Sequence, residues 1–167
     1  MERVLIIGCG GAGKSTLARK LGEKTGLPVV HLDRIWWEPG NWQHISREEF
    51  DVRLAAELVK PQWILDGNFN RTIETRLRYC DTVIYLDFNR FVCLKSWVGR
   101  VIKNWGHTRE DMGDGCNEWF DPTMLRWIWQ FNKNNRKRYY QLLSEVEEVD
   151  IIILKNRRQV ERYLQNL

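Results

Sequence analysis

Cysteine, proline and repeated segments are all scarce in this sequence. Its 167 residues include four cysteines and four prolines. The cysteines show no C-x-x-C spacing and do not form a disulfide framework, so we expect a protein of a reducing compartment. The sequence also has no internal repeat, low-complexity segment or linker. The four cysteines are Cys9, Cys80, Cys93 and Cys116.

Long apolar runs are missing as well. No stretch approaches the roughly 20 residues that a membrane span needs. No signal peptide is recognisable before the first apolar run, at residues 4–7. We therefore expect a cytoplasmic protein without a membrane partner.

A strong excess of one charge is the third absence. The formal net charge is +4, which suits a protein that binds anionic phosphates but does not by itself support nucleic-acid binding. With 43% hydrophobic residues, the chain can bury one substantial core. We therefore expect a single domain over residues 1–167.

A glycine-rich turn lies between the first apolar run and a helical pattern. Residues 8–15 read GCGGAGKS and fit G-x-x-x-x-G-K-[ST], a P-loop. Glycines let backbone N–H groups curl around a phosphate at the positive end of a helix dipole. We expect Lys14 to reach the β- and γ-phosphates of ATP and act in catalysis, and Ser15 to bind Mg²⁺. The expected nucleotide-binding residues here are Gly8, Gly10, Gly11, Ala12, Gly13, Lys14, Ser15 and Thr16.

The same letters contain a rival pattern for a dinucleotide. Gly8, Gly10 and Gly13 fit G-x-G-x-x-G, and Asp33 follows where a ribose-binding acid is expected. That pattern has no use for Lys14 directly after its third glycine, whereas a triphosphate site requires this lysine. The short chain also leaves little room for a separate substrate domain. We therefore favour ATP.

Further apolar runs predict the other strands of an α/β sheet, and two of them deliver an acid at their ends. In such sheets, ligands bind at the carboxyl ends of the strands. We expect Asp66, with Ser15, to bind Mg²⁺. We expect Asp33 to orient or deprotonate an acceptor, or else to cap a helix or pair with Arg34. The predicted strands after the first are residues 29–32, 63–66, 82–87 and 151–154.

Residues 34–45 are rich in aromatic side chains and have no regular period, so we expect a loop. A loop this apolar must pack against something. Either it forms a wall of an acceptor pocket, with Trp36 stacking on a ring, or it folds onto its own domain.

Local signals predict the helices. Ser46 and Glu49 form a capping box, and Asp121 followed by Pro122 is a typical helix start. Between them, apolar residues at three- and four-residue intervals predict an amphipathic helix. Its apolar stripe contains Phe91, Leu94, Val98, Val101 and Trp105.

Charges alternate in blocks along the second half of the chain. Residues 89–109 and 122–140 carry only cations, and residues 110–121 carry only acids. Two basic helices around an acidic loop predict a lid over about residues 100–136 that closes on a triphosphate. We expect Arg100 and Arg109 to stabilise the transferred group, with Arg136 and Arg138 as weaker candidates. The alternative is solvated helix faces that pair with each other.

Two known groups resemble this sequence. Residues 65–72, LDGNFNRT, resemble the Leu-Asp-Gly-Phe-Pro-Arg-Thr segment of adenylate-kinase-related P-loop kinases, although one asparagine is inserted and another replaces the proline. This resemblance implies that Asp66 binds magnesium. It also implies that Arg71, with Arg76 beside it, binds a phosphate on the acceptor.

Nearly the whole chain is similar to a small group of bacterial P-loop proteins named DNA topology modulation proteins, which look like nucleoside or nucleotide kinases. The resemblance implies a three-layer α/β P-loop fold with a five-stranded parallel sheet in the order 2-3-1-4-5, and purine binding near Arg157. The group's name implies an effect on DNA, but no DNA-reading element is recognisable. The similar pieces are residues 8–16, 31–33, 64–68, 85–87, 108–112 and 153–155.

The sequence therefore predicts a kinase that uses ATP and Mg²⁺ and phosphorylates a small acceptor of the nucleoside or nucleotide kind. Two other classes stay open. One is a nucleotide-dependent regulatory ATPase that acts on DNA topology or on a protein partner. The other is a dinucleotide-binding module.

Overall fold

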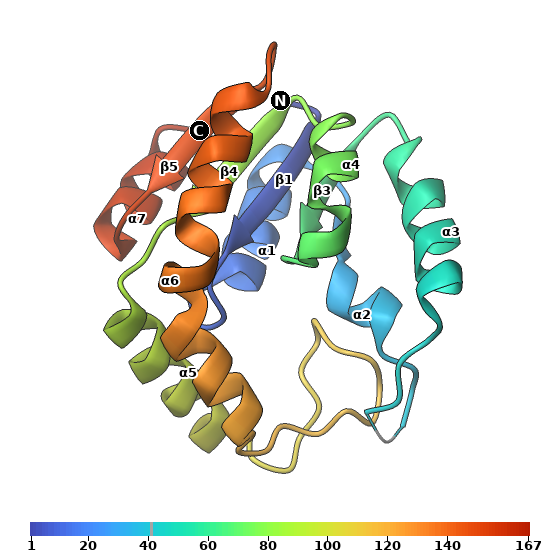
Figure 1. Cartoon of the computed structure of the whole chain (residues 1–167), viewed down its shortest axis with the longest axis vertical. Helices are drawn as coiled ribbons and strands as arrows, with labels where there is room; N and C mark the ends of the chain where they lie inside the picture. Colours follow the sequence, from blue (N-terminus) through green and yellow to red (C-terminus); the bar gives the residue numbers. More distant parts are fainter. Residues whose placement is uncertain (41) are drawn as a thin grey trace.

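The computed structural model describes residues 1–40 and 42–167 of the chain, which form an α/β fold around a five-stranded sheet (Figure 1). Within these residues, no helix combines the length and apolar character needed to cross a membrane. The strands are β1 (Arg3–Gly8), β2 (Val29–His31), β3 (Trp63–Asp66), β4 (Thr82–Leu86) and β5 (Asp150–Leu154). The helices are α1 (Lys14–Thr25), α2 (Leu32–Trp36), α3 (Arg47–Leu58), the 3₁₀ turn η1 (Asn70–Thr72), α4 (Ile73–Leu77), α5 (Arg90–Lys103), α6 (Pro122–Glu145) and α7 (Arg157–Gln165).

The strand order is β2-β3-β1-β4-β5 and every pairing is parallel, which confirms the predicted sheet. The central strand β1 pairs with β3 on one side and β4 on the other, with Ile6 opposite both Asp66 and Ile84. All carboxyl ends therefore meet at one edge of the sheet. The glycine-rich turn after β1 and the carboxylate of Asp66 lie at this edge, where ligands of open α/β sheets bind.

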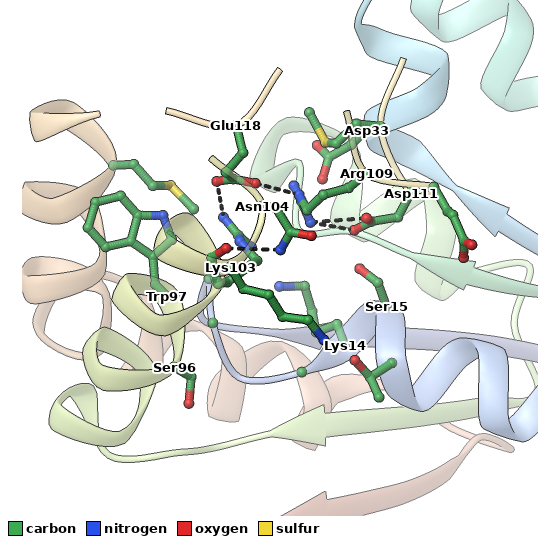
Figure 2. Close-up of a pocket in the computed structure, with 18 of the residues that line it drawn as sticks. Lys14, Ser15, Asp33, Ser96, Trp97, Lys103, Asn104, Arg109, Asp111 and Glu118 are labelled. Atoms are coloured by element: carbon green, nitrogen blue, oxygen red, sulfur yellow. Dashed lines mark hydrogen bonds and ion pairs between the residues drawn. The ribbon is translucent and has the colours of Figure 1, made fainter. Parts of the chain in front are cut away.

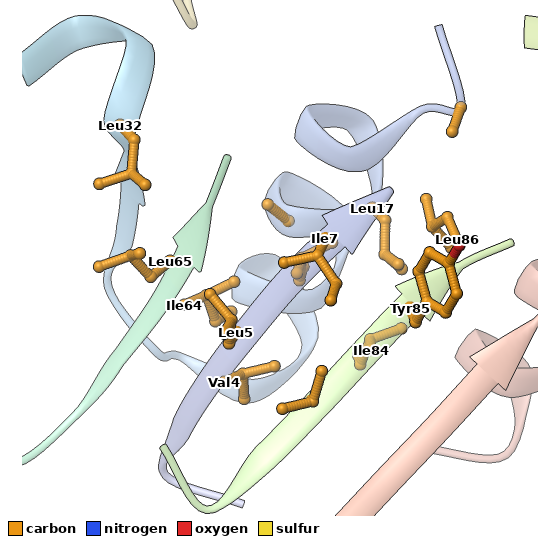
Figure 3. Close-up of a cluster of buried hydrophobic side chains, with 14 of the residues drawn as sticks. Val4, Leu5, Ile7, Leu17, Leu32, Ile64, Leu65, Ile84, Tyr85 and Leu86 are labelled. Atoms are coloured by element: carbon orange, nitrogen blue, oxygen red, sulfur yellow. The ribbon is translucent and has the colours of Figure 1, made fainter. Parts of the chain in front are cut away.

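Helices cover both faces of the sheet, with α6 in front of it and α1 behind it in Figure 1. The strand residues Val4 to Ile7 are fully buried, and Leu17 of α1 packs against them (Figure 3). On the other face, Ile128 and Phe131 of α6 are buried. Burial on both faces explains why β1 reads as an unbroken apolar run rather than an alternating one.

The chain after β2 differs from the prediction. The strand ends at His31 and α2 begins at Leu32, so the strand does not reach residue 32 and the expected loop begins with a short helix. Asp33 consequently lies in the first turn of α2 and not at the end of a strand. Residue 41 of the expected aromatic loop lies outside the described residues.

The predicted helix starts are confirmed. Ser46 caps α3 by accepting a hydrogen bond from the Glu49 N–H at 3.1 Å, and Asp121 caps α6 through the Thr123 N–H at 2.8 Å. The Glu49 carboxylate does not complete the capping box in this structure. It instead pairs with Arg53 one turn later, at 2.5 Å.

The predicted inward stripe of α5 is wrong for most of its residues. Phe91 and Trp105 are 62% and 60% exposed, and the buried face consists of Cys93, Trp97 and Val101. Both sets are apolar at helical spacing, so the periodicity could not distinguish them. Tertiary contacts determine which face of α5 is buried, because the glycine-rich turn and α6 both pack against α5 on the Cys93 side.

Residues 104–121, between α5 and α6, contain isolated bridges but no helix or strand. This segment crosses toward the chain after α2, as Figure 1 shows in yellow. There the Trp42 indole N–H donates to the Asn117 carbonyl oxygen at 3.0 Å, and the Gly40 N–H donates to the Asp114 carbonyl oxygen at 2.6 Å. Two segments far apart in sequence thus meet opposite the glycine-rich turn.

Candidate functional site

The glycine-rich turn presents free backbone N–H groups at the start of α1. Gly11 and Gly13 have φ angles of +78° and +95°, which side-chain-bearing residues rarely adopt. No side chain of the described residues caps α1, so its first amides are left for a ligand. The Lys14 ammonium folds back over the turn and donates to the Cys9 carbonyl oxygen at 3.1 Å.

Close packing behind the turn fixes its shape. A Cβ atom on Gly11 would lie 2.2 Å from the carbonyl oxygen of Cys93 in α5, so no larger residue fits without movement of the backbone. The Gly8 N–H donates to the Asn68 side-chain oxygen at 3.0 Å. The turn is therefore held between α5 and the segment that follows β3.

A cavity of about 980 Å³ opens onto this turn. It is walled by the glycine-rich turn, α2, α5, residues 104–121 and the first residues of α6 and α7 (Figure 2). Gly8 and Ala12 do not line it because they are packed underneath the turn. The predicted site residues that line it are Gly10, Gly11, Gly13, Lys14, Ser15, Thr16, Asp33, Asp66, Arg100, Arg109 and Arg157.

Two carboxylates face the cavity beside the turn. Burial, followed by the nearby charge of Asp66, raises the pKa of Asp33 to about 6. Asp66 is 5% exposed, and its Oδ2 lies 3.0 Å from Nδ1 of His31. Its other oxygen, Oδ1, is buried without a hydrogen-bond partner among the described residues. An unpaired buried carboxylate oxygen is costly unless a cation or a donor approaches it.

These residues fit a magnesium ion that arrives with a nucleotide. Within residues 1–40 and 42–167, no cluster of three or more His, Cys, Asp or Glu side chains could hold a metal by itself. Magnesium bound to a nucleotide needs only one or two protein ligands, because phosphates and water supply the rest. Asp66, with its orphaned Oδ1, and Ser15, with its hydroxyl, both line the cavity and have the required chemistry.

Two arginines reach the same cavity from the opposite wall and are held there by acids (Figure 2). Arg109 contacts Asp111 at 2.8 Å and Glu118 at 2.6 Å, and Arg100 contacts Glu118 at 3.2 Å. Burial, followed by the like charge of Arg109, lowers the pKa of Arg100. The Nε atoms of both arginines are buried without a well-directed hydrogen bond among the described residues. Acids therefore hold both guanidinium groups at the cavity, but part of their hydrogen-bonding capacity is unused.

A second group of cations lies on the side of α5 and α7. Lys103 lines the cavity next to Asn104, and Arg157 lines it at the start of α7. An Nη atom of Arg157 is 3.6 Å from the position of a Cβ on Gly13, and its other Nη donates to the Ser96 hydroxyl at 2.7 Å. Arg157 thus flanks the glycine-rich turn, although it is 144 residues away in sequence.

Three expected acceptor-binding residues do not line the cavity. Trp36 packs inward, stacked on His44 at 4.5 Å and edge-on against Phe50 at 5.5 Å. Arg71 pairs with Asp51 on the surface at 2.6 Å. Arg76 is fully buried, and its guanidinium donates to the carbonyl oxygens of residues 67–69 and 72.

The two weaker lid candidates also lie elsewhere. Arg136 pairs with Asp87 at 2.8 Å, where Asp87 also accepts from the Tyr140 hydroxyl at 2.8 Å. Arg138 pairs with Glu74 at 3.1 Å on the surface. Both contacts join α6 to the rest of the fold and leave these arginines outside the cavity.

The sequence interpretation missed several cavity residues. Trp37, next to the chosen Trp36, lines the cavity, because α2 ends there and turns the following side chain outward. In the sequence, the acids of residues 110–121 are recognisable only as a block of charge, and Trp97 lies outside the apolar stripe predicted for α5. The missed lining residues with a chemical role are Trp37, Trp42, Trp97, Lys103, Asn104, Asp111 and Glu118.

Comparison with solved structures shows a shared fold. The chain is similar to shikimate kinase from Bacteroides thetaiotaomicron, with a TM-score of 0.58 and 15% identity over 99% of this chain and 95% of that one. It is similar to shikimate kinase from Acinetobacter baumannii in complex with shikimate, with a TM-score of 0.60 and 16% identity over 99% and 90%. It is also similar to deoxyadenosine kinase from M. mycoides with bound dCTP, with a TM-score of 0.52 and 14% identity over 98% and 97%.

Comparison of the sequence itself gives a match over only a small part of the chain. The profile of the isopentenyl transferase family matches residues 1–37, which contain β1, the glycine-rich turn, α1, β2 and α2. No curated protein matches the chain. The chain therefore has the fold of small-molecule P-loop kinases, at identities that establish the fold alone.

Proposed function

We propose that this protein is a kinase that transfers the γ-phosphoryl group of magnesium-bound ATP to a small acceptor. One observation carries the proposal. One cavity is lined by the glycine-rich turn with its uncapped helix start, by Lys14, by Asp66 with its orphaned carboxylate oxygen, and by two incompletely satisfied arginines. Phosphoryl transfer requires this combination of alignment and charge neutralisation and little else from a protein.

In this proposal, the residues around the turn hold the triphosphate. The amides of Gly10, Gly11 and residues 13–16, with the Lys14 ammonium, bind phosphate oxygens. The Ala12 N–H is already used by the Cys9 carbonyl oxygen at 3.1 Å. Ser15 and Asp66 hold Mg²⁺, which neutralises charge on the phosphates when it is bound. Arg157 lies beside the turn and is our candidate for contact with the nucleotide base, as the family resemblance implies.

Arg100 and Arg109 then act on the transferred group. Both already line the cavity, so they need only exchange carboxylate partners for phosphate oxygens. Glu118 would hold both arginines in place while no nucleotide is bound, and Asp111 would keep its contact with Arg109 throughout. We propose that residues 104–121 form the moving part of this lid, within the single domain expected from the sequence.

Asp33 completes the site on the acceptor side. A carboxylate with a pKa near 6 is mostly ionised at neutral pH and can accept the proton of an acceptor hydroxyl. Its position beside the Asp66 end of the cavity favours this role over the alternative of an ion pair with Arg34. In the structure, Arg34 instead donates to the Glu110 carbonyl oxygen at 3.1 Å.

A coupled assay of ADP release tests the proposal. The protein with Mg-ATP is expected to release ADP slowly alone and much faster with one member of a panel of small alcohols, nucleosides and nucleotides. Arg109→Ala should lower this rate by about 10³-fold, the effect of losing a transition-state arginine. Arg138→Ala, which removes a surface arginine outside the cavity, should leave it unchanged. ADP release that responds to DNA and to no small acceptor would contradict the proposal.

A further inference from the structure

The two ends of the cavity differ in charge. Near the glycine-rich turn and α5, the cavity is lined by Lys14, Lys103 and Arg157, none of which forms an ion pair among the described residues. On the α2 side of the turn, Asp33 and Asp111 stand close together, and Asp111 lies beside Ser15 (Figure 2). The unpaired positive charge is thus concentrated where the proposed function puts the triphosphate.

The cations nearer the acceptor end are already neutralised. Arg109 contacts two carboxylates, and Arg19 pairs with Glu110 at 3.0 Å. The arginines that would bind an acceptor phosphate by family resemblance are absent from the cavity. Arg71 is on the surface, and Arg76 is buried against backbone carbonyls. An anionic acceptor would therefore enter an acid-rich site without an unpaired cation to bind it, which is unfavourable.

A cationic acceptor also lacks a partner. Asp66 contacts His31 and offers its second oxygen to magnesium, and Asp111 contacts Arg109. Among the described carboxylates beside the glycine-rich turn, only Asp33 is left, and it is needed for the hydroxyl group that attacks. Asp121 also lines the cavity, but it lies at the start of α6, where its side chain caps the helix through the Thr123 N–H. The charges around Asp33 thus favour an uncharged acceptor with a reactive alcohol.

Aromatic rings supply the remaining wall of this end. Trp37 and Trp42 both line the cavity, and their rings meet at 80° with centroids 5.2 Å apart. The indole N–H of Trp42 is already used by the Asn117 carbonyl oxygen at 3.0 Å, so the ring contributes apolar surface. The lid packs directly behind Trp37, because a Cβ on Gly113 would lie 2.6 Å from the Trp37 carbonyl oxygen. Rigid indole walls favour flat rings, which bury large apolar area at little entropic cost.

We infer that the phosphate acceptor is an uncharged alcohol that carries a flat ring, as a nucleoside does, and not a phosphate ester or a carboxylate. The inference rests on the proposed kinase function and extends it to the chemistry of the acceptor. It separates this site from one that takes nucleotides, and from one that takes shikimate, which carries a carboxylate.

Matched pairs of acceptors test the inference. ADP release and the phosphorylated product, identified by mass spectrometry, are measured at saturating Mg-ATP for nucleosides and for their 5′-monophosphates, with shikimate and an amino alcohol as charged comparisons. At least one nucleoside is expected to exceed its monophosphate by about tenfold or more in kcat/KM, a difference of roughly 1.4 kcal/mol.

The other outcomes are distinguishable. A monophosphate, a carboxylate or an amino alcohol as the best acceptor would overturn the inference and leave the kinase function intact. Binding of Mg-ATP without stimulation by any acceptor would overturn both.

Variants of the aromatic wall give a second readout. Trp37→Leu and Trp42→Leu are expected to raise the acceptor KM by about tenfold, the loss of one aromatic contact, with the KM for ATP unchanged. Trp129→Leu is the matched control, since Trp129 is 47% exposed on α6 and does not line the cavity. Trp37→Phe should recover most of the acceptor affinity. An equal effect of the control, or a change in the KM for ATP alone, would overturn the assignment of Trp37 and Trp42 to the acceptor.

Discussion

At the scale of single residues, Asp33 shows how the site modifies a side chain. Its carboxylate lies in a partly enclosed cavity near Asp66, and both burial and this charge disfavour the ionised form. Because the pKa is raised to about 6, protonation at mildly acidic pH removes the proposed base. We expect kcat/KM to rise with pH through a step near pH 6 and to level off above pH 7. A pH profile without this step in the wild type would exclude Asp33 as the base.

The same shift predicts a change in stability. A carboxyl group whose pKa is raised on folding destabilises the folded state when it is ionised. For Asp33, this destabilisation is absent well below pH 4 and fully present above pH 6. Asp33→Asn should therefore raise the melting temperature at pH 7.5, by about 2–4 °C per kcal/mol for a chain of this size. The gain should vanish at pH 4 or below, and thermal scans at both pH values measure it. An equal gain at both values would mean that the charge of Asp33 is not the cause.

Arg76 illustrates a residue whose role depends on burial. Its guanidinium is fully buried and ties the chain after β3 together through carbonyl oxygens, including that of Gly67 at 2.7 Å. Burial lowers its pKa to about 10, so it still carries a charge at neutral pH. Arg76→Met would leave several buried carbonyls without a donor, at a cost of about 3 kcal/mol or more. Urea denaturation should show this loss, whereas Arg78→Met at the exposed neighbouring position should cost less than about 0.5 kcal/mol. A loss of acceptor affinity with unchanged stability would restore the phosphate-binding role.

These residues also mark the limit of what the sequence could predict. Arg71, Arg76 and Arg78 occupy one short stretch, and nothing local distinguishes the buried one from the two exposed ones. Trp36 and Trp37 are neighbours, and only the end of α2 decides which faces the cavity. The residue types therefore indicated arginines and tryptophans at the site. Which arginine or tryptophan reaches the cavity depends on the direction of its side chain, which the sequence does not specify.

At the scale of elements, residues 104–121 connect the charges of the site. Glu118 is 6% exposed and contacts both Arg100 and Arg109. Glu118→Gln should destabilise the nucleotide-free protein by about 1–3 kcal/mol, because two partly buried like charges lose their shared counter-ion. Saturating Mg-ATP should reduce this deficit, since phosphate oxygens would replace the carboxylate.

Thermal scans with and without Mg-ATP measure both effects. Asp114→Asn is the control, because Asp114 lies in the same segment, is exposed and is 3.9 Å from Arg34. It should change stability by less than about 0.5 kcal/mol. A deficit in Glu118→Gln that is the same with and without nucleotide would contradict a role of the arginines in phosphate binding.

Elements with local signals were the easiest to predict. The caps at Ser46 and Asp121 and the apolar strands depend on neighbouring residues and are confirmed. The buried face of α5 was predicted wrongly, because two apolar stripes compete and only contact with the glycine-rich turn selects one. The alternating charge blocks indicated a lid, which stays a prediction. They could not indicate which acid pairs with which arginine, such as Glu118 with both Arg100 and Arg109.

At the scale of the whole molecule, the parallel sheet explains why the site forms where it does. The order β2-β3-β1-β4-β5 puts the glycine-rich turn beside the end of β3 and therefore beside Asp66. The P-loop was predictable from its motif, and the sheet order was predictable from the resemblance to small P-loop kinases. The wall formed by Trp37, Trp42 and residues 104–121 was not, because it depends on contacts between segments more than 60 residues apart.

The proposed function depends most on the binding of three linked phosphates by the turn after β1. Isothermal titration calorimetry with Mg²⁺ and a non-hydrolysable ATP analogue tests this directly, on the wild type and on Lys14→Ala. We predict saturable one-to-one binding to the wild type and a loss of at least about tenfold in affinity, roughly 1.4 kcal/mol, in the variant at unchanged thermal stability. No binding by the folded wild type, or equal binding by the two proteins, would contradict the central claim.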